Sequence, residues 1–229
     1  MIKNSIFSKK GESFLRNEMC ICIDNLRNKI SIDAPEYIEL FKNIVDEYLK
    51  LGFHSSTDRS LNTKQSKENK AMFESCLKYD ETLTKLEEYP KVRSIYEAFY
   101  FSLRNYLNEG LSGVWYHQDC LSWYPKVIIT KNFGSRDVLD SLNDIITIYR
   151  GTTEDEFNSN NFGQAWSLKK SIADEFAFEF YQNSDNYKDV VRVVIQAQIN
   201  KNDIYNYRNN HREAEVIINP TKLIDVVSL

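Results

Sequence analysis

The sequence predicts an α+β fold in which helices come first and a mainly antiparallel sheet follows. Up to about residue 125 the apolar residues repeat with helical spacing, and after it they alternate as in strands. The composition is that of a globular protein, with 42% hydrophobic and 27% charged residues, and 229 residues can bury a core without disulfides or metal. We therefore expect one domain over 1–229, with a helical part at 1–125 and a β-rich part at 126–229.

The helical part is expected to contain at least three helices. The first starts after the cap candidate Asp33 and stops at Gly52, and its apolar residues fall on one face. A polar stretch at 54–70 is expected to be an exposed loop or the frayed approach to the second helix. The third follows Pro90, carries a wide apolar stripe and stops at Gly110. The expected ranges are 34–51, about 69–87, and 91–109.

Short alternating segments predict the strands of the second part. A helix is expected among them, because Ser171 and Asp174 form a capping-box pattern and Ile172, Phe176 and Phe180 repeat every four residues, which gives Phe180 a place in the core. The expected strands are KVIIT (126–130), ITIYR (146–150), QAWSL (164–168), VVRVVIQAQI (190–199), EVIIN (215–219) and LIDVVSL (223–229).

Charge and cysteine content exclude some functional classes. The net charge is −4, with 17 basic against 18 acidic residues in 1–125 and 12 against 15 in 126–229, so no broad basic surface for nucleic acid is expected. The four cysteines lack the spacing of a zinc site, and we interpret them as reduced thiols. With no apolar run of 18 residues and no secretory signal, we expect a cytoplasmic protein with no membrane partner, although delivery into another cell would leave no mark in the sequence.

Three short motifs contain candidate functional residues. Glu213 and Glu215 open a predicted strand, where residues two apart point to the same face and their charges would be coupled; alone, the pair is also typical of an edge strand. Arg150 ends a predicted strand beside Gly151, where a guanidinium suits a phosphate or carboxylate, or an ordinary surface ion pair. Ser167 lies on the predicted strand between them, where a serine is usually just a satisfied hydroxyl.

Taken in order, these residues resemble the Arg-Ser-Glu class of mono-ADP-ribosyltransferases, which includes bacterial toxins and arginine-specific ectoenzymes. The matching segments are Tyr149-Arg150-Gly151, Trp166-Ser167-Leu168, Ala173-Asp174-Glu175-Phe176 and Glu213-Ala214-Glu215. The resemblance covers about residues 145–229 and implies an ADP-ribosyltransferase-like core of two β-sheets behind N-terminal helices. The chain departs from the family where the serine is flanked by Trp166 and Leu168, since the family commonly has Ser-Thr-Ser.

The resemblance implies a role for each site residue. Arg150 would hold the phosphates or ribose of NAD, and the Gly151 backbone would bind the nicotinamide amide. Ser167 would hydrogen-bond Glu215, whose carboxylate would accept the ribose 2′-hydroxyl and stabilise an oxocarbenium-like transition state. Glu213 would orient and deprotonate an arginine acceptor. Trp166 and an aromatic residue, Phe180 or Phe178, are candidates for NAD contact, and His211 is read as a loop residue that could touch the acceptor.

The function implied is transfer of ADP-ribose from NAD to a macromolecule, as a bacterial or phage toxin, effector or defence factor. The acidic balance and Glu213 favour protein arginine, while Lys64, Lys67 and Lys70 keep an RNA or DNA base open as the acceptor. NAD glycohydrolysis and a catalytically inactive binding module are the alternatives. NAD would be consumed as substrate, since no GxGxxG or P-loop motif occurs, no metal is expected, and an antitoxin or immunity protein is a conceivable partner.

Overall fold

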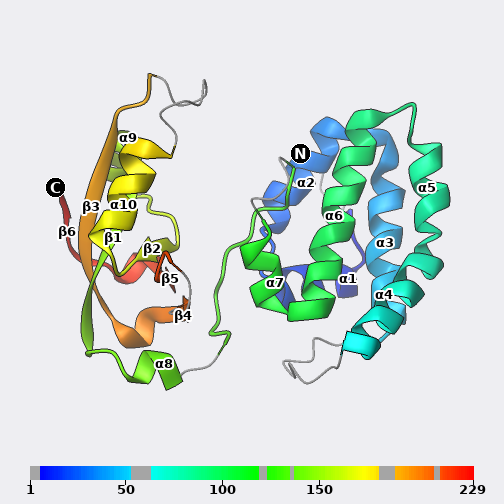
Figure 1. Cartoon of the computed structure of the whole chain (residues 1–229). Helices are drawn as coiled ribbons and strands as arrows, with labels where there is room; N and C mark the ends of the chain where they lie inside the picture. The colour runs from blue at the N-terminus through cyan, green and yellow to red at the C-terminus, as the bar shows by residue number, and fades with distance from the viewer. Residues whose placement is uncertain (1–5, 53–62, 119–122, 135–136, 181–188, 209–211) are drawn as a thin grey trace. The chain divides into compact units, whose positions relative to one another are not determined.

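The computed structural model describes residues 6–52, 63–118, 123–134, 137–180, 189–208 and 212–229. The chain divides into two compact units, residues 1–128 and 129–229, where the sequence suggested one domain with parts at 1–125 and 126–229. The first unit is helical and the second contains the β-sheet (Figure 1). The chain thus has helices first and an antiparallel sheet second, which is consistent with the α+β class.

The helical unit is built around α6, whose buried stripe packs against α3. Phe41 of α3 lies against Phe99 of α6, with ring centroids 6.0 Å apart. Tyr48 of α3 is fully buried, and this burial raises its pKa far above the ordinary value. The helices of this unit are α1 (Lys9–Ser13), η1 (Phe14–Glu18), α2 (Ile23–Asp33), η2 (Pro35–Tyr37), α3 (Ile38–Lys50), α4 (Thr63–Leu77), α5 (Tyr79–Lys85), α6 (Pro90–Glu109) and α7 (Leu111–Tyr116).

The first and third predicted helices are confirmed, with stops at glycines of positive φ, Gly52 and Gly110. The second is two helices, α4 and α5, separated by the left-handed Lys78, and α4 starts at Thr63, inside the stretch expected to be a loop or the frayed approach to this helix. The cap assigned to Asp33 is wrong. Asp33 is the last residue of α2, and its carboxylate pairs with Lys91 and accepts the Trp123 indole N–H.

The second unit contains one six-stranded antiparallel sheet with the strand order β4-β5-β2-β1-β3-β6 (Figure 1). Two sheets were expected, and the described strands form one. The strands are β1 (Ile145–Thr153), β2 (Ala165–Ser167), β3 (Arg192–Asn200), β4 (Ile204–Arg208), β5 (Glu215–Ile218) and β6 (Ile224–Ser228). Around them lie α8 (Asp137–Asp140), α9 (Glu154–Ser159), α10 (Lys170–Asp174), η3 (Glu175–Glu179), η5 (Lys201–Asp203) and η6 (Pro220–Lys222).

The sheet has two different faces because neighbouring residues of a strand point to opposite sides. On one, the core face, Ile148, Trp166 and Val216 belong to the main hydrophobic core of the unit. On the other, the helix face, Tyr149 and Val194 pack against Ala173 and Ala177 of the α10–η3 helix. The long helix α10–η3 therefore covers part of one face, over β1 and β3 (Figure 1).

Five of the six predicted strands are present, and one prediction is wrong. Residues 126–130 form no strand and make a single bridge, between Val127 and Ile21. Strand β4 was not predicted. The expected capping box is wrong as well, since the N-cap of α10 is Lys169, which makes no side-chain cap bond, and Ser171 is exposed.

Candidate functional site

The sheet register brings two of the predicted site residues together. Ser167 of β2 is the direct partner of Glu215 of β5, and its other partner is Tyr149 of β1. Arg208, the last residue of β4, is in turn the partner of Glu215. Directly opposite residues on antiparallel strands share a face, with Cβ atoms about 4.5 to 5.5 Å apart. Tyr149, Ser167, Glu215 and Arg208 therefore form one row across four strands on the helix face, called here the cross-strand row.

The Ser167 hydroxyl is buried and bonded to the main chain. It donates to the carbonyl oxygen of Glu213 at 2.6 Å and accepts the backbone N–H of Lys169 at 2.9 Å. The resemblance implied a bond from Ser167 to the Glu215 side chain. In the structure, the hydroxyl instead fixes the backbone two residues before Glu215.

Glu213 and Glu215 do not lie on one strand. Strand β5 begins at Glu215, and Ala214 has a left-handed backbone with φ +45°. Such a residue interrupts the alternation of an extended chain. The expectation that both carboxylates project from one strand face is therefore wrong. Glu213 lies in the turn, Glu215 opens the strand, and both are half-buried.

The turn before β5 is anchored to the segment between β2 and the helix. Backbone N–H of Leu168 donates to the Ala214 carbonyl at 3.2 Å, and the Lys169 ammonium donates to the Arg212 carbonyl at 3.1 Å. The Arg212 guanidinium pairs with Glu175 of η3. Together with the Ser167 bond, these contacts hold the position of Glu213 and Glu215 relative to β2.

Arg150 lies on the opposite face of the sheet from the cross-strand row. It follows Tyr149 in β1, and its guanidinium donates to the Glu156 carboxylate, 2.8 Å from Nε to Oε1 and 3.3 Å from Nη2 to Oε2, and to the Ala165 carbonyl at 2.6 Å. Arg150 and Glu156 are both mostly buried, with side chains 23% and 20% exposed. The arginine thus joins β1, α9 and β2.

Glu156 is a residue that the sequence interpretation missed. Its carboxylate also accepts the Thr152 hydroxyl and the Gly163 backbone N–H, the latter at 2.9 Å. Burial raises the pKa of Glu156, but the bonds from Arg150, Thr152 and Gly163 together outweigh it and leave the pKa below its ordinary value. The available signal was a capping box, since Thr153 is the N-cap of α9 and its hydroxyl accepts the Glu156 backbone N–H at 3.1 Å.

Gly151 allows the helix to contact the sheet closely. A Cβ at this position would lie 2.1 Å from the Ala173 carbonyl oxygen and 2.6 Å from the Ala177 nitrogen. The same close contact explains the alanine of the Ala-x-x-Phe segment, because Ala173 and Ala177 are the small residues that face Gly151. A helix-packing role therefore accounts for the glycine after Arg150.

The aromatic candidates lie in different surroundings. Trp166 is 2% exposed in the main core, and its indole N–H donates to the Gly163 carbonyl at 2.9 Å, so its ring is covered on the face away from Ser167. Phe180 is 69% exposed and stacks on Phe176, with centroids 5.2 Å apart, and Phe178 is 56% exposed. The core position expected for Phe180 is therefore wrong.

The remaining candidate residues lie on α4 or outside the described residues. His211 lies outside the described residues, and Lys70 is on α4, where it pairs with Glu74 at 3.6 Å. Lys64 and Lys67 belong to the same helix.

Among the described residues, no group of three or more His, Cys, Asp or Glu could hold a metal ion. No helix in the described ranges has the length and apolar character needed to span a bilayer.

Comparison of the chain with family models, with curated proteins and with solved structures gives no match.

Proposed function

We propose that this protein is a mono-ADP-ribosyltransferase that cleaves NAD at the nicotinamide–ribose bond and transfers ADP-ribose to a macromolecule. One observation carries the proposal: Ser167 and Glu215 are direct cross-strand partners, and the Ser167 hydroxyl holds the turn that carries Glu213. The chain has Arg, Ser and Glu-x-Glu in the same sequence order as the family that it resembles. In addition, Ser167, Glu213 and Glu215 have a fixed arrangement in space.

The chemistry follows from the positions of the two glutamates. The Glu215 carboxylate accepts the 2′-hydroxyl of the nicotinamide ribose and stabilises the positive charge that develops as the C–N bond breaks. Nicotinamide leaves with the bonding electron pair. The acceptor nitrogen then forms a new bond to the same ribose carbon.

Glu213 has a separate task because it occupies a turn rather than the strand. A guanidinium is a poor nucleophile, since its pKa lies above about 12. A carboxylate beside the reaction centre orients the guanidinium and takes its proton as the new C–N bond forms. A protein arginine is therefore the acceptor that we favour, in the cytoplasm of the cell in which the protein acts as a toxin, effector or defence factor.

The test is release of nicotinamide and transfer of label from NAD in a cell extract. Wild type is expected to label a macromolecule, and Glu215→Gln to lose both activities by on the order of 10²- to 10³-fold. Glu213→Gln is expected to lose transfer and keep nicotinamide release. Protease sensitivity of the label identifies a protein acceptor, and nuclease sensitivity a nucleic acid.

The same variants separate the alternatives. A wild type that releases nicotinamide and labels nothing would be an NAD glycohydrolase. A wild type that neither cleaves nor binds NAD at millimolar concentration would contradict the proposal and favour a binding module.

A further inference from the structure

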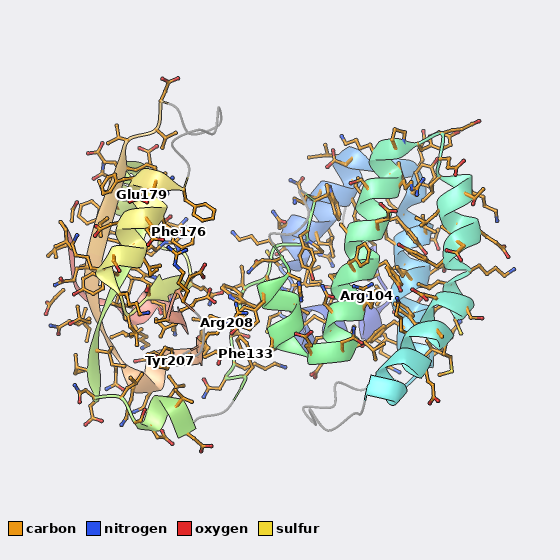
Figure 2. The ribbon with its side chains drawn as sticks, in the orientation of Figure 1. Arg104, Phe133, Phe176, Glu179, Tyr207 and Arg208 are labelled. Atoms are coloured by element: carbon orange, nitrogen blue, oxygen red, sulfur yellow. The ribbon has the colours of Figure 1, made fainter. Side chains whose placement is uncertain are left out.

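The position of Arg208 differs from that of the other arginines around the site. It ends β4 opposite Glu215, and Glu215 is opposite Ser167. Arg208 is half-buried, and Figure 2 shows it at the end of β4, with Phe176 and Glu179 on the α10–η3 helix. Its Cα is therefore one strand away from the residue that we propose to bind the ribose.

Arg150 is poorly placed for a ligand of that face. It points to the core face, where Glu156 and the Ala165 carbonyl accept its N–H groups. A phosphate bound by this guanidinium would have to displace a carboxylate that also holds Thr152 and Gly163. Separating such a mostly buried pair leaves an uncompensated charge, which is strongly destabilising.

Two further arginines in the described part of the second unit lie outside the cross-strand row. Arg192 donates to the carbonyl oxygens of Ala177 and Phe176, at 2.9 and 3.1 Å, and so caps the η3 helix. Arg212 pairs with Glu175. Among the described arginines, Arg208 is the one in the cross-strand row.

The chemistry of NAD points to a role for Arg208 at this position. In NAD the diphosphate is attached through the 5′-carbon to the same ribose whose 2′-hydroxyl would be held by Glu215. A guanidinium offers a planar fork of donors that matches phosphate oxygens. We propose that Arg208 binds the diphosphate of NAD, the role that the resemblance gives to Arg150. The inference rests on the proposed function, because it assumes that NAD binds over Glu215.

The experiment compares a substrate that has the diphosphate with one that lacks it. Binding of NAD and of ADP-ribose is measured by calorimetry, and cleavage is measured for NAD and for nicotinamide riboside, in wild type, Arg208→Gln and Arg150→Gln. Lys222→Gln removes an exposed positive charge from the η6 turn and controls for net charge.

Arg208→Gln is expected to weaken NAD and ADP-ribose binding by about 10- to 100-fold, the effect of losing charged hydrogen bonds. Cleavage of nicotinamide riboside should stay within about twofold of wild type, a selectivity that a merely structural role would not give. Arg150→Gln should lower the unfolding temperature and impair both substrates alike.

Other outcomes would overturn the inference. Unchanged NAD binding in Arg208→Gln, or equal loss with both substrates, would show that Arg208 does not hold the diphosphate. Selective loss of NAD binding in Arg150→Gln would return that role to Arg150. If the wild type binds NAD without cleaving it, the binding measurements still decide the role of Arg208, and only the proposed catalysis fails. If the wild type binds neither NAD nor ADP-ribose, both proposals fail.

Discussion

Ser167 and Glu215 lie directly opposite each other on β2 and β5, yet the Ser167 hydroxyl donates to the main-chain carbonyl of Glu213 at 2.6 Å. The same oxygen accepts the Lys169 N–H at 2.9 Å. One buried side chain therefore fixes both the turn that enters β5 and the turn that leaves β2. In this geometry the serine fixes the backbone of the segment that carries the two glutamates, and it acts on Glu215 through that backbone.

Removing the Ser167 hydroxyl should affect stability as well as activity. Ser167→Ala leaves the Glu213 carbonyl and the Lys169 N–H without this partner, which lowers the free energy of unfolding by about 1–3 kcal/mol. Nicotinamide release should fall too, because the Glu213–Glu215 segment is no longer held. Urea unfolding and NAD cleavage are measured against Ser141→Ala, whose exposed hydroxyl donates only to the nearby Val138 carbonyl. An active Ser167→Ala protein of wild-type stability would contradict this interpretation.

Because of Glu156, the stability of the second unit should fall at acid pH. Its folded-state pKa is lowered by Arg150, Thr152 and Gly163, which outweigh burial, so it contributes stability above its unfolded pKa of about 4.3. That contribution is lost as pH falls from there through the lower folded pKa. Glu156→Gln should lower the free energy of unfolding at neutral pH by about 2–4 kcal/mol.

The measurement is thermal unfolding of wild type and Glu156→Gln between pH 7 and acid. The difference between them should shrink as pH falls from about 4.3 through the lower folded pKa of Glu156, because below that pKa both proteins carry an uncharged group at this position. Glu154→Gln, an exposed residue of the same helix, should follow wild type throughout. A difference that stays constant with pH would mean that the charge of Glu156 is not what stabilises Arg150.

Gly151→Ala tests the close contact between helix and sheet. The added methyl would lie 2.1 Å from the Ala173 carbonyl oxygen, so α10–η3 must move away from β1. Forcing a group into a packed contact costs about 1–3 kcal/mol, and the shift should also disturb the Lys169–Ser167 connection. Chemical unfolding is compared with Ser171→Ala, an exposed position on the same helix. Equal stability of the two variants would show that the helix yields without loss.

The elements with strong local patterns could be predicted from the sequence. The third helix was expected because Pro90 and Gly110 enclose an uninterrupted apolar stripe, and the structure has it at Pro90–Glu109. β3 was expected because Ile195, Ala197 and Ile199 alternate with polar residues, and these three side chains are fully buried. In both cases burial of a single face decides the structure, and that face is visible in the sequence.

The errors arise where a tertiary contact or a backbone irregularity decides. The left-handed Ala214 separates the two glutamates, and no residue type announced it. Ala173 and Ala177 are the residues of α10–η3 that pack on the sheet, and Phe180 stacks on Phe176 outside that contact, so the four-residue repeat of the phenylalanines does not mark the buried face. β4 was missed because its buried positions include Asn206 beside Ile204, which breaks the apolar alternation.

Phe180 gives the last prediction, because its exposure separates a binding role from a packing role. It is 69% exposed on the surface of the helix and rests on Phe176 with an interplanar angle of 20°, so Phe180→Ala should change the free energy of unfolding by no more than about 1 kcal/mol. If its ring stacks on the nicotinamide, as the resemblance implies, the substitution should raise the KM for NAD about 5- to 100-fold, since stacking of a base on an aromatic ring contributes about 1–3 kcal/mol. Phe178→Ala tests the other aromatic candidate, since Phe178 is 56% exposed two residues away on a helix, where side chains two apart do not share a face, and only the variant of the stacking residue should raise the KM. Steady-state kinetics and unfolding curves on the same preparations settle the matter, because a stable Phe180→Ala protein with an unchanged KM would remove Phe180 from the proposed NAD site.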